Sequence, residues 1–349
     1  MSDLMKQLSV EELRRKQAMT LEEKISYSEG KIHEFVEAMG GEDKVFVSFS
    51  GGKDSTVMLH MIRKLYPGVK GVFCNTGLEY PEVLKFVKTV DNVVWLKPRK
   101  TVSQVWREYG VPCVSKEQSS YVECVRNSNS EKLVGKRLNY RGGYHLSKKW
   151  IFLTDKNFTS YESSDKCCKY FKKLPTEDYV KETKTYPFVG TMAGESLLRL
   201  NSWVRHSCNM YDGKKIQSRP LSVWTDEDIW AYIKKFDLEI CELYHMGHPR
   251  TGCAFCPYGA NLDKSEKNKF ELLKEQHPTQ YSALGKLGIR DVLKDMGVRI
   301  ANDPEYMAEM QQRQQEIDEW FKMVEADIKE KGAESEHYKY HKYFTKKGE

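Results

Sequence analysis

The stretch Ser50-Gly51-Gly52-Lys53-Asp54-Ser55 decides the fold of this 349-residue chain. It follows the apolar residues 45–49 and precedes the apolar segment 56–62, an order that predicts a buried strand, a glycine turn and a helix. Backbone N–H groups gather at the beginning of such a helix, where the helix dipole also favours negative charge. The spacing differs from the G-x-x-x-x-G-K-S/T of a Walker A loop. The stretch therefore predicts a phosphate-binding turn of another type.

A second strand-like run, residues 69–74, ends in Asn75, Thr76 and Gly77. Ligands of a doubly wound sheet bind at the carboxyl ends of its strands. We therefore expect these three residues to face the same ligand as the first turn.

Two further strand candidates, residues 91–96 and 186–190, alternate with helical stretches. Alternation of strand and helix is typical of a parallel sheet covered by helices. The predicted fold class is α/β.

The string S-G-G-x-D-S resembles the PP-loop of the ATP pyrophosphatase superfamily. The residues from Asn75 onward resemble the D-T-G-x-x-F/Y-P-E-T segment of its phosphoadenosine/adenosine phosphosulfate (PAPS/APS) reductase group, with Asn75 in place of aspartate and no threonine after Glu82. Further stretches at 109–116, 190–199, 219–230 and 243–256 also resemble that group. This resemblance implies a doubly wound, mostly parallel sheet with a cysteine-rich subdomain. The domain would bind ATP, or APS or PAPS, with Mg²⁺.

The resemblance also implies roles for individual residues. Lys53 would neutralise charge as pyrophosphate leaves, Asp54 would place Mg²⁺ or the phosphates, and Arg199 would lie near phosphate or sulfate. An alternative for Glu195 is a helix-capping role, because an acidic side chain in a first turn is favourable on dipole grounds alone. The expected nucleotide-binding residues are Ser48, Ser50, Gly51, Gly52, Lys53, Asp54, Ser55, Asn75, Thr76, Gly77, Gly190, Glu195 and Ser196.

Clustered cysteines form the second chemical signal. The chain shows no signal-like segment near residue 1 and no apolar run of about 20 residues, so we expect a cytoplasmic protein without membrane contact. Cysteine clusters in that compartment indicate metal or redox chemistry rather than disulfides. The candidates are the tandem pair Cys167 and Cys168, the C-x-x-C pair Cys253 and Cys256, and Cys208.

Similarity to the APS reductase branch implies a 4Fe–4S cluster on these cysteines, and structural zinc is the alternative. Cys168, Cys253 and Cys256 are the firmest expected ligands, and Cys167 and Cys208 are alternatives for the fourth position. The other cysteines occupy apolar or strand-like surroundings and are expected to be small core residues: Cys74, Cys113, Cys124 and Cys241.

One departure from the family pattern bears on the reaction. The reductases carry a C-terminal E-C-G-I/L-H motif whose cysteine attacks the sulfonucleotide, and no cysteine follows Cys256 in this sequence. A thiol-based reductase mechanism needs such a nucleophile. Sulfonucleotide reduction is therefore kept as an alternative.

Domain organisation follows from these segments. We expect N-terminal helices over 1–42, a PAPS reductase-like PP-loop domain over 43–261 with an insert at 116–166, and a helical C-terminal extension over 262–349. Thr20 with Glu23 has the spacing of a capping box.

The net charge of the chain does not identify a binding partner. The net charge of +6 is mild for this length. Basic and aromatic residues alternate within 131–150 and 338–347, a composition that suits stacking on bases and neutralising phosphates but also a solvated loop.

Three functions remain open. The first is an ATP-dependent enzyme that adenylates an acceptor, such as tRNA or DNA, and inserts sulfur from the cluster or from a persulfide on a donor protein. The second is an APS or PAPS reductase without its own C-terminal nucleophile. The third is a non-catalytic nucleotide-binding subunit of a larger complex. A homo-oligomer or complex subunit is expected.

Overall fold

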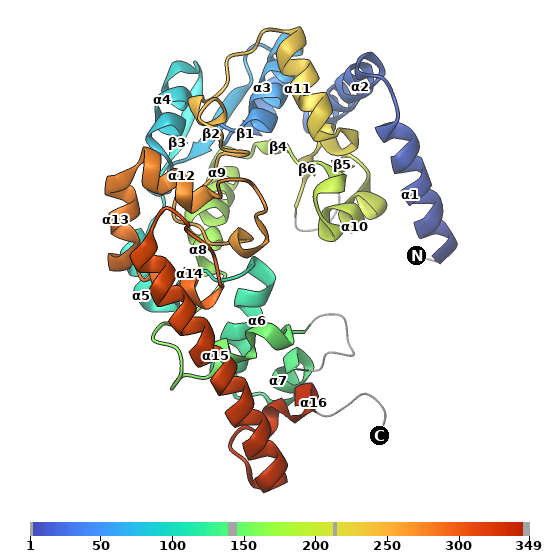
Figure 1. Ribbon diagram of the computed structural model, residues 1–349. Helices are drawn as coiled ribbons and strands as arrows, with labels where there is room; N and C mark the ends of the chain where they lie inside the picture. The colour runs from blue at the N-terminus through green and yellow to red at the C-terminus, as the bar shows by residue number, and fades with distance from the viewer. Residues whose placement is uncertain (1–2, 139–144, 212–214, 345–349) are drawn as a thin grey trace. The chain divides into compact units, whose positions relative to one another are not determined.

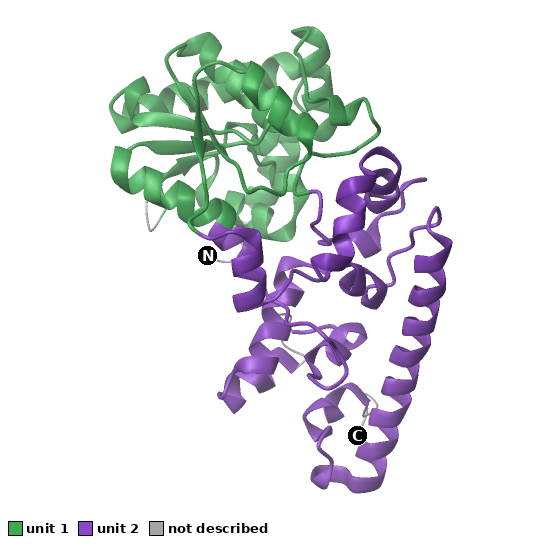
Figure 2. Cartoon of the chain, turned by 90° about the vertical axis from the view of Figure 1, so that its left-hand side faces the viewer, with its two compact units in different colours: residues 1–99, 171–253 green, residues 100–170, 254–349 purple. Residues whose placement is uncertain are grey.

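A computed structural model describes residues 3–138, 145–211 and 215–344. The chain divides into two compact units (Figure 2): unit 1 holds residues 1–99 and 171–253, and unit 2 holds residues 100–170 and 254–349. The boundaries 1–42, 43–261 and 262–349 remain a prediction. Part of the predicted basic and aromatic signal lies outside the described residues, namely Tyr140, Arg141, Tyr144, Lys346 and Lys347.

Unit 1 is built on a six-stranded sheet (Figure 1). Its strands are β1 (Val45–Ser48), β2 (Lys70–Cys74), β3 (Val93–Leu96), β4 (Tyr186–Val189), β5 (Asn209–Met210) and β6 (Gln217–Ser218). The order is β3-β2-β1-β4-β6-β5, and every pair is parallel except β5 with β6. The helices of this unit are α1 (Asp3–Gln17), α2 (Leu21–Met39), α3 (Lys53–Leu65), α4 (Pro81–Thr89), α9 (Leu174–Thr183), α10 (Leu197–His206) and α11 (Asp226–Lys235).

Helices cover both faces of this sheet. Val47 of β1 lies opposite Phe188 of β4, so these two side chains share a face and Phe46 points to the other. The ring of Phe35 from α2 packs on Phe188 with centroids 5.1 Å apart, and the ring of Tyr179 from α9 packs on Phe46 at 5.3 Å. The predicted doubly wound, mostly parallel α/β fold is confirmed.

Local sequence signals place the helix ends of unit 1. Thr20 and Glu23 form the predicted capping box, with the Thr20 amide donating to the Glu23 carboxylate at 2.8 Å. Thr225 and Asp228 do the same at the beginning of α11. Each box satisfies backbone donors that the first helical turn leaves without a partner.

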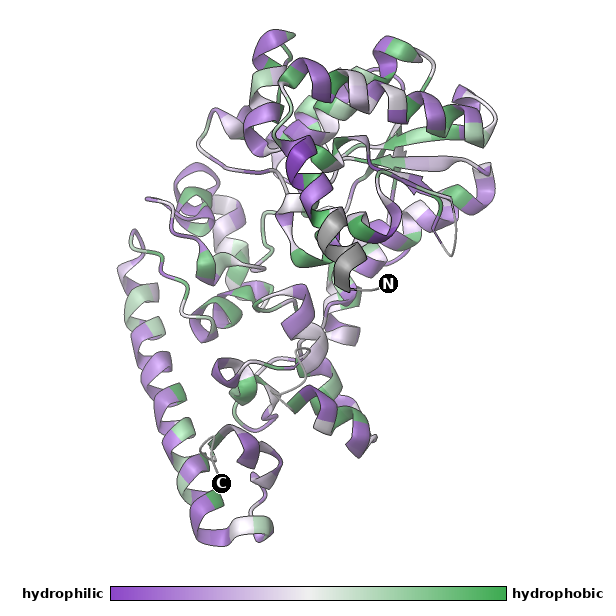
Figure 3. Cartoon of the chain, turned by 90° about the vertical axis from the view of Figure 1, so that its right-hand side faces the viewer, coloured by the Kyte–Doolittle hydropathy of each residue, from purple (hydrophilic) through white to green (hydrophobic). Residues whose placement is uncertain are grey.

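Unit 2 consists of helices in the described residues. They are α5 (Val102–Tyr109), α6 (Lys116–Asn127), α7 (Glu131–Leu138), α8 (Lys166–Cys168), α12 (Lys269–Gln276), α13 (Pro278–Lys286), α14 (Ile289–Asp295), α15 (Pro304–Lys331) and α16 (His341–Phe344), with a 3-10 turn over Lys148–Thr154. Helix α15 carries hydrophilic and hydrophobic residues side by side along its length (Figure 3). The predicted helical C-terminal region is confirmed.

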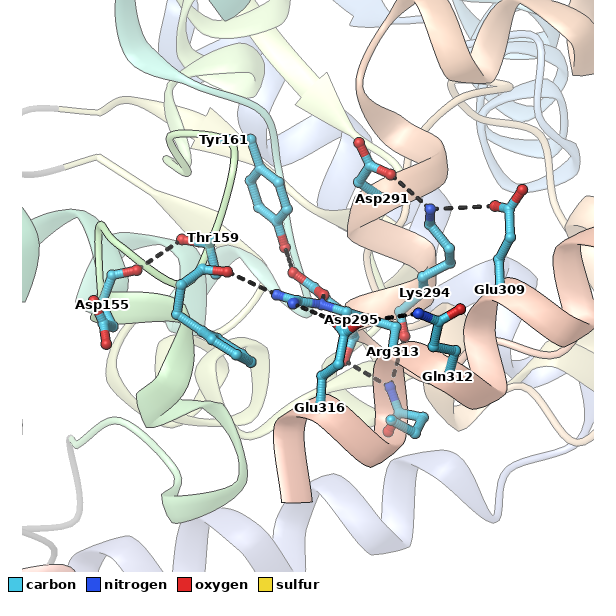
Figure 4. A network of polar contacts seen from close by, with 12 residues as sticks. Asp155, Thr159, Tyr161, Asp291, Lys294, Asp295, Glu309, Gln312, Arg313 and Glu316 are labelled. Carbon is cyan, nitrogen blue, oxygen red and sulfur yellow. Dashed lines mark hydrogen bonds and ion pairs between the residues drawn. The ribbon is translucent and has the colours of Figure 1, made fainter. Parts of the chain in front are cut away.

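A buried carboxylate ties three segments of unit 2 together (Figure 4). Asp295 at the end of α14 accepts hydrogen bonds from Arg313 Nε of α15 at 2.6 Å and from the Tyr161 hydroxyl at 2.7 Å. Arg313 also donates to the carbonyl of Phe158 at 3.0 Å. Burial raises the pKa of Asp295, and Arg313 opposes that effect.

Two tyrosines of the predicted basic and aromatic tail belong to the core of unit 2. Tyr340 and Tyr343 are 1% and 8% exposed. The Tyr340 hydroxyl lies 2.7 Å from the Thr154 hydroxyl, and Tyr343 donates to the Leu146 carbonyl at 2.7 Å. These rings are held inside the unit and are not free to stack on bases.

Across the described ranges, we find no helix that combines the length and the apolar character needed to cross a bilayer.

Candidate functional site

The turn between β1 and α3 requires its glycines. Gly51 has φ of 71°, a left-handed conformation, and a Cβ atom there would lie 2.9 Å from Cγ2 of Val87. A Cβ on Gly52 would lie 2.6 Å from the Thr251 hydroxyl oxygen. Both positions exclude any larger residue without a shift of the chain. The backbone of the turn is therefore closely approached from two sides.

Serine hydroxyls hold the turn in shape. The Ser50 amide donates to the Ser55 hydroxyl at 3.2 Å, and the two hydroxyl oxygens lie 3.1 Å apart. Ser55 in turn donates to the Gly52 carbonyl at 2.9 Å. Two of the predicted nucleotide-binding serines therefore bond to each other across the turn, and Ser50 also lines the cavity described below.

Lys53, the first residue of α3, carries a buried ammonium group. Its side chain is 6% exposed and its Nζ donates to Asp54 at 2.8 Å and to Asp226 of α11. Burial acts to lower the pKa of Lys53, but the hydrogen bonds that it donates to Asp226 and Asp54 outweigh this effect, and the pKa is raised. Trp230 places its ring 5.8 Å from Nζ and donates to Asp226 at 3.1 Å. The lysine is held charged at the predicted phosphate site.

Backbone donors at the same helix end also have partners. The Lys53 amide donates to the Tyr244 hydroxyl at 2.8 Å, and the Gly52 amide donates to the Ser50 hydroxyl at 3.4 Å. Burial raises the pKa of Tyr244, while the Lys53 amide and Thr251 lower it. A tyrosine oxygen thus occupies the kind of position in which a phosphate oxygen would accept.

The loop after β2 is folded around one carboxylate. Glu79 accepts from the Thr76 amide at 3.0 Å, from the Thr76 hydroxyl at 2.7 Å and from the Gly77 amide at 3.1 Å. The Gly77 amide also donates to the Asn75 side chain at 3.1 Å. Sequence reasoning missed Glu79, although its spacing of three from Thr76 is that of a local side-chain-to-backbone motif.

This loop lies directly against a predicted cluster cysteine. Cys253 forms an isolated antiparallel bridge with Glu79, and its sulfur is 3.9 Å from the Thr76 hydroxyl oxygen. A residue of the C-x-x-C motif and a residue of the predicted nucleotide loop are therefore neighbours in unit 1.

A cavity of about 240 Å³ opens at the carboxyl ends of β1 and β2. Its walls come from both loops, from α9 and from the segment before Cys253. Residues that line it include Ser48, Ser50, Cys74, Glu79, Lys172 and Thr251. Two of them, Ser48 and Ser50, were expected at a nucleotide site.

Cys74 corrects an expectation. It is half-buried and lines this cavity, with its sulfur 3.4 Å from the Thr176 hydroxyl. Cys124 is also only half-buried, whereas Cys113 and Cys241 are buried as predicted. Burial raises the pKa of the Cys74 thiol. Its position as the last residue of β2, immediately before Asn75, is the sequence signal that could have identified it.

The third predicted segment supplies an arginine and two helix caps. Glu195 accepts from the Met192 amide at 2.7 Å and pairs with Arg199, and the Ser196 hydroxyl accepts from the Arg199 amide at 3.3 Å as the cap of α10. The structure thus gives Glu195 and Ser196 capping contacts.

Arg199 and Gly190 lie near Asp54. Burial lowers the pKa of Arg199, the charge of Asp54 raises it, and the charge of Arg250 lowers it. A Cβ on Gly190 would lie 3.4 Å from the Asp54 carbonyl oxygen. These residues extend the predicted site from the β1–α3 turn toward the end of β4.

Three of the predicted cysteine ligands belong to unit 2. Cys167, Cys168 and Cys256 all act to raise the pKa of the buried Tyr258, in addition to its burial. The Tyr258 hydroxyl has no hydrogen bond of standard geometry within the described residues, although Ser119 lies close enough to lower its pKa. A buried donor beside three thiols fits a group that accepts hydrogen bonds.

Cys208 has different surroundings, in unit 1. It is 0% exposed, and the Tyr27 hydroxyl lies 3.6 Å from its sulfur. Burial and Cys208 together raise the pKa of Tyr27. Cys208 is therefore in contact with Tyr27 of α2, and the choice between Cys167 and Cys208 as the fourth thiol stays a prediction.

For metal binding, the geometry of the described residues and the chemistry of their side chains point in different directions. The described part of the chain contains no group of three or more His, Cys, Asp or Glu side chains arranged to hold a metal ion. The donor set itself suits the group, because thiols are the ligands of iron–sulfur clusters and of structural zinc. The thiols around Tyr258 lie in unit 2, and Cys253 lies in unit 1.

Comparison with known proteins identifies relatives. Residues 44–112 and 122–258 match the family described as phosphoadenosine phosphosulfate reductase domain. An uncharacterised protein of Methanocaldococcus jannaschii is 27% identical over 230 residues, 65% of this chain and 38% of that protein. An adenosine 5'-phosphosulfate reductase of Bacillus cereus is 22% identical over 233 residues, 64% of this chain and 79% of that enzyme. The chain thus spans about two fifths of the length of the first relative.

Two solved structures resemble the chain more distantly. A PAPS reductase from Candida auris, in complex with phosphate, has a TM-score of 0.39 at 15% identity, with 68% of this chain and 96% of that chain covered. A U34-tRNA thiolase from Methanococcus maripaludis with a 4Fe–4S cluster has a TM-score of 0.35 at 13% identity, with 78% of this chain and 80% of that chain covered.

Proposed function

Since the chain belongs to the phosphoadenosine phosphosulfate reductase domain family, we propose that it binds ATP at the β1–α3 turn, adenylates an acceptor and takes part in sulfur transfer. One observation carries this proposal. Cys253 is bridged to Glu79, and its sulfur lies 3.9 Å from Thr76 in the loop beside the predicted nucleotide cavity. A thiol-bearing motif next to a nucleotide loop suits chemistry that joins an activated acceptor to sulfur.

The nucleotide would be held by charge and by backbone donors. Its phosphates would lie at the beginning of α3, where the dipole and Lys53 offset their negative charge. Asp54, which is partly exposed beside Lys53, would place Mg²⁺ through its carboxylate oxygens. Arg199, whose pKa responds to Asp54, would approach the same phosphates.

Adenylation changes no oxidation state and needs no external oxidant or reductant. An acceptor oxygen attacks the α-phosphorus, the bond to the bridging oxygen of the β-phosphate breaks, and pyrophosphate leaves. Lys53 stabilises the charge that develops on the leaving group. A sulfide then displaces AMP, which keeps the acceptor oxygen. A nucleic acid base carbonyl or another oxygen nucleophile is an acceptor of the required chemistry.

On the sequence motifs alone, we propose Cys167, Cys168, Cys253 and Cys256 as the ligands of a 4Fe–4S cluster, with Cys208 as the alternative to Cys167. A bound cluster would supply a site at which inorganic sulfur can be held. Zinc in its place would make the same thiols structural. Tyr258 would direct its buried hydroxyl toward this group.

Sulfonucleotide reduction is the second candidate, favoured by the similarity to the Bacillus cereus APS reductase. The two reactions leave different products. The full-length protein, purified anaerobically, is incubated with ATP, Mg²⁺ and pooled cellular RNA or DNA, and separately with APS or PAPS plus a dithiol.

Equal amounts of AMP and pyrophosphate, dependent on added nucleic acid and lost in Lys53→Met, support adenylation. Sulfite from APS or PAPS, without pyrophosphate from ATP, would replace the proposal with reduction. Tight ATP binding without either product would indicate a non-catalytic nucleotide-binding subunit.

A further inference from the structure

We infer that residues 244–253 form a cover over the nucleotide loops, and that the Tyr244 hydroxyl is an internal occupant of the phosphate position that bound nucleotide must displace. This inference rests on the proposed nucleotide site and adds a gating step to it. We call residues 244–253 the cover segment.

The cover segment is fixed to both loops of the site. Tyr244 accepts from the Lys53 amide at 2.8 Å, and Cys253 is bridged to Glu79. Between these ends, the His248 ring packs edge-on against Tyr80 with centroids 4.9 Å apart. Contacts at the two ends and in the middle of the segment therefore reach the β1–α3 turn, the loop after β2 and the beginning of α4.

Tyr244 is well suited to stand in for an anion. Its oxygen accepts the amide hydrogen at the positive end of α3, the position that favours a phosphate oxygen. Its ring is held by an edge-on contact with Trp230 at 5.6 Å. Trp230 also binds Asp226, which pairs with Lys53. Both the amide and the ammonium of Lys53 are therefore engaged by groups of the protein.

The cavity beneath the segment is small for a nucleotide. Its volume is about 240 Å³, and Thr251 and Gly252 line it. Pockets for drug-sized ligands commonly enclose about 300–1,000 Å³. The Thr251 hydroxyl oxygen lies 2.6 Å from the position that a Cβ on Gly52 would take, so the segment packs closely on the turn. A whole nucleotide would therefore contact Thr251 and Gly252, and in this proposal the segment moves away to admit it.

The cover segment is released when a phosphate oxygen replaces the Tyr244 oxygen as the acceptor of the Lys53 amide hydrogen. Tyr244 then loses the hydrogen bond that fixes it. Opening then depends on the ligand, because the ligand binds the open form better than the closed one. Nucleotides without an anion at this position would leave the segment closed.

Isothermal titration with inorganic pyrophosphate tests this inference on the full chain and on Tyr244→Phe. The variant keeps the ring contact with Trp230 and removes the competing oxygen. We expect pyrophosphate to bind about five-fold more tightly, the change given by loss of one competing hydrogen bond. Tyr211→Phe is the matched control, because Tyr211 in the same unit donates instead to Glu34 and should leave pyrophosphate affinity unchanged.

Amide hydrogen exchange of residues 245–252 supplies the second readout. Pyrophosphate should accelerate exchange in the original chain, and Tyr244→Phe should exchange rapidly with or without it. Weaker or equal pyrophosphate binding by Tyr244→Phe, with normal binding by the original chain, would overturn the gating role alone. Failure of every variant to bind both pyrophosphate and ATP would overturn the proposed nucleotide site as well.

Discussion

Cys253 pairs with Glu79 in an isolated antiparallel bridge, and Glu79 is the carboxylate around which the predicted nucleotide loop is folded. One residue therefore connects the cysteine motif to the loop after β2. This contact places Cys253, the first cysteine of the C-x-x-C motif, beside the predicted nucleotide loop in unit 1.

Replacement of Glu79 by glutamine tests that connection. The change puts an amide NH₂ against donors from Thr76 and Gly77, so buried hydrogen bonds are lost and the cost is about 1–3 kcal/mol of unfolding free energy. Chemical denaturation measures it. Glu37→Gln, on the exposed face of α2, is the control and should change the unfolding free energy by less than about 0.5 kcal/mol. Equal effects of the two changes would contradict the role of Glu79.

A pair of glycine substitutions tests the turn. Gly51→Ala places a Cβ at positive φ and 2.9 Å from Val87, and should destabilise the fold by about 1–3 kcal/mol. Gly30→Ala, inside α2 with nothing within 4 Å of its Cβ, should stabilise it by about 0.5–1 kcal/mol. Denaturant midpoints measure both. Stabilisation by Gly51→Ala would show that the turn adopts another shape.

The ion pair of Lys53 with Asp226 predicts opposite effects of two changes. Asp226→Asn removes a carboxylate that competes with the ATP phosphates for the Lys53 ammonium. Because Asp226 is largely exposed, the change should tighten ATP binding by only about two- to five-fold. Lys53→Met should weaken binding by at least ten-fold, roughly the loss of a charged hydrogen bond to phosphate. Titration calorimetry measures both, with Asp43→Asn, another exposed pair in unit 1, as the control. Weaker ATP binding by Asp226→Asn would instead make Asp226 a ligand contact.

Unit 2 depends on its buried carboxylate. Asp295→Asn leaves the Arg313 guanidinium without its closest anionic partner and should cost about 3–5 kcal/mol of stability. Asp291→Asn on the same helix removes only a half-exposed pair with Lys294 and should cost less than about 1 kcal/mol. Urea unfolding of the two variants compares them directly. Similar midpoints for both would mean that the Asp295 network contributes little.

The sequence predicted the architecture well because its signals are local. The runs 45–49, 69–74 and 186–190 are short, apolar and β-branched or aromatic, and each is a strand of the sheet. The glycines of the first turn pointed to a backbone conformation that the structure shows at Gly51. Thr20 and Thr225 begin helices through side-chain contacts only three residues away.

Contacts between residues far apart in the sequence could not be predicted from such local signals. Asp226 and Tyr244 reach Lys53 across separations of 173 and 191 residues, and no spacing rule connects them. The tail tyrosines looked like stacking residues because composition does not reveal burial. The cysteines were grouped by motif alone, whereas the contacts of Cys208 with Tyr27 depend on how α2 packs.

The most direct test of the account is the iron, acid-labile sulfide and zinc content of the anaerobically purified chain and of three serine variants. The account predicts iron and sulfide in equal amounts in the original chain and in Cys208→Ser, and their loss in Cys253→Ser and Cys256→Ser, with all four proteins folded. Zinc alone would make the thiols structural. Retention of iron and sulfide in Cys253→Ser, or their loss in Cys208→Ser alone, would contradict the claim that the cysteine beside the nucleotide loop belongs to the sulfur site.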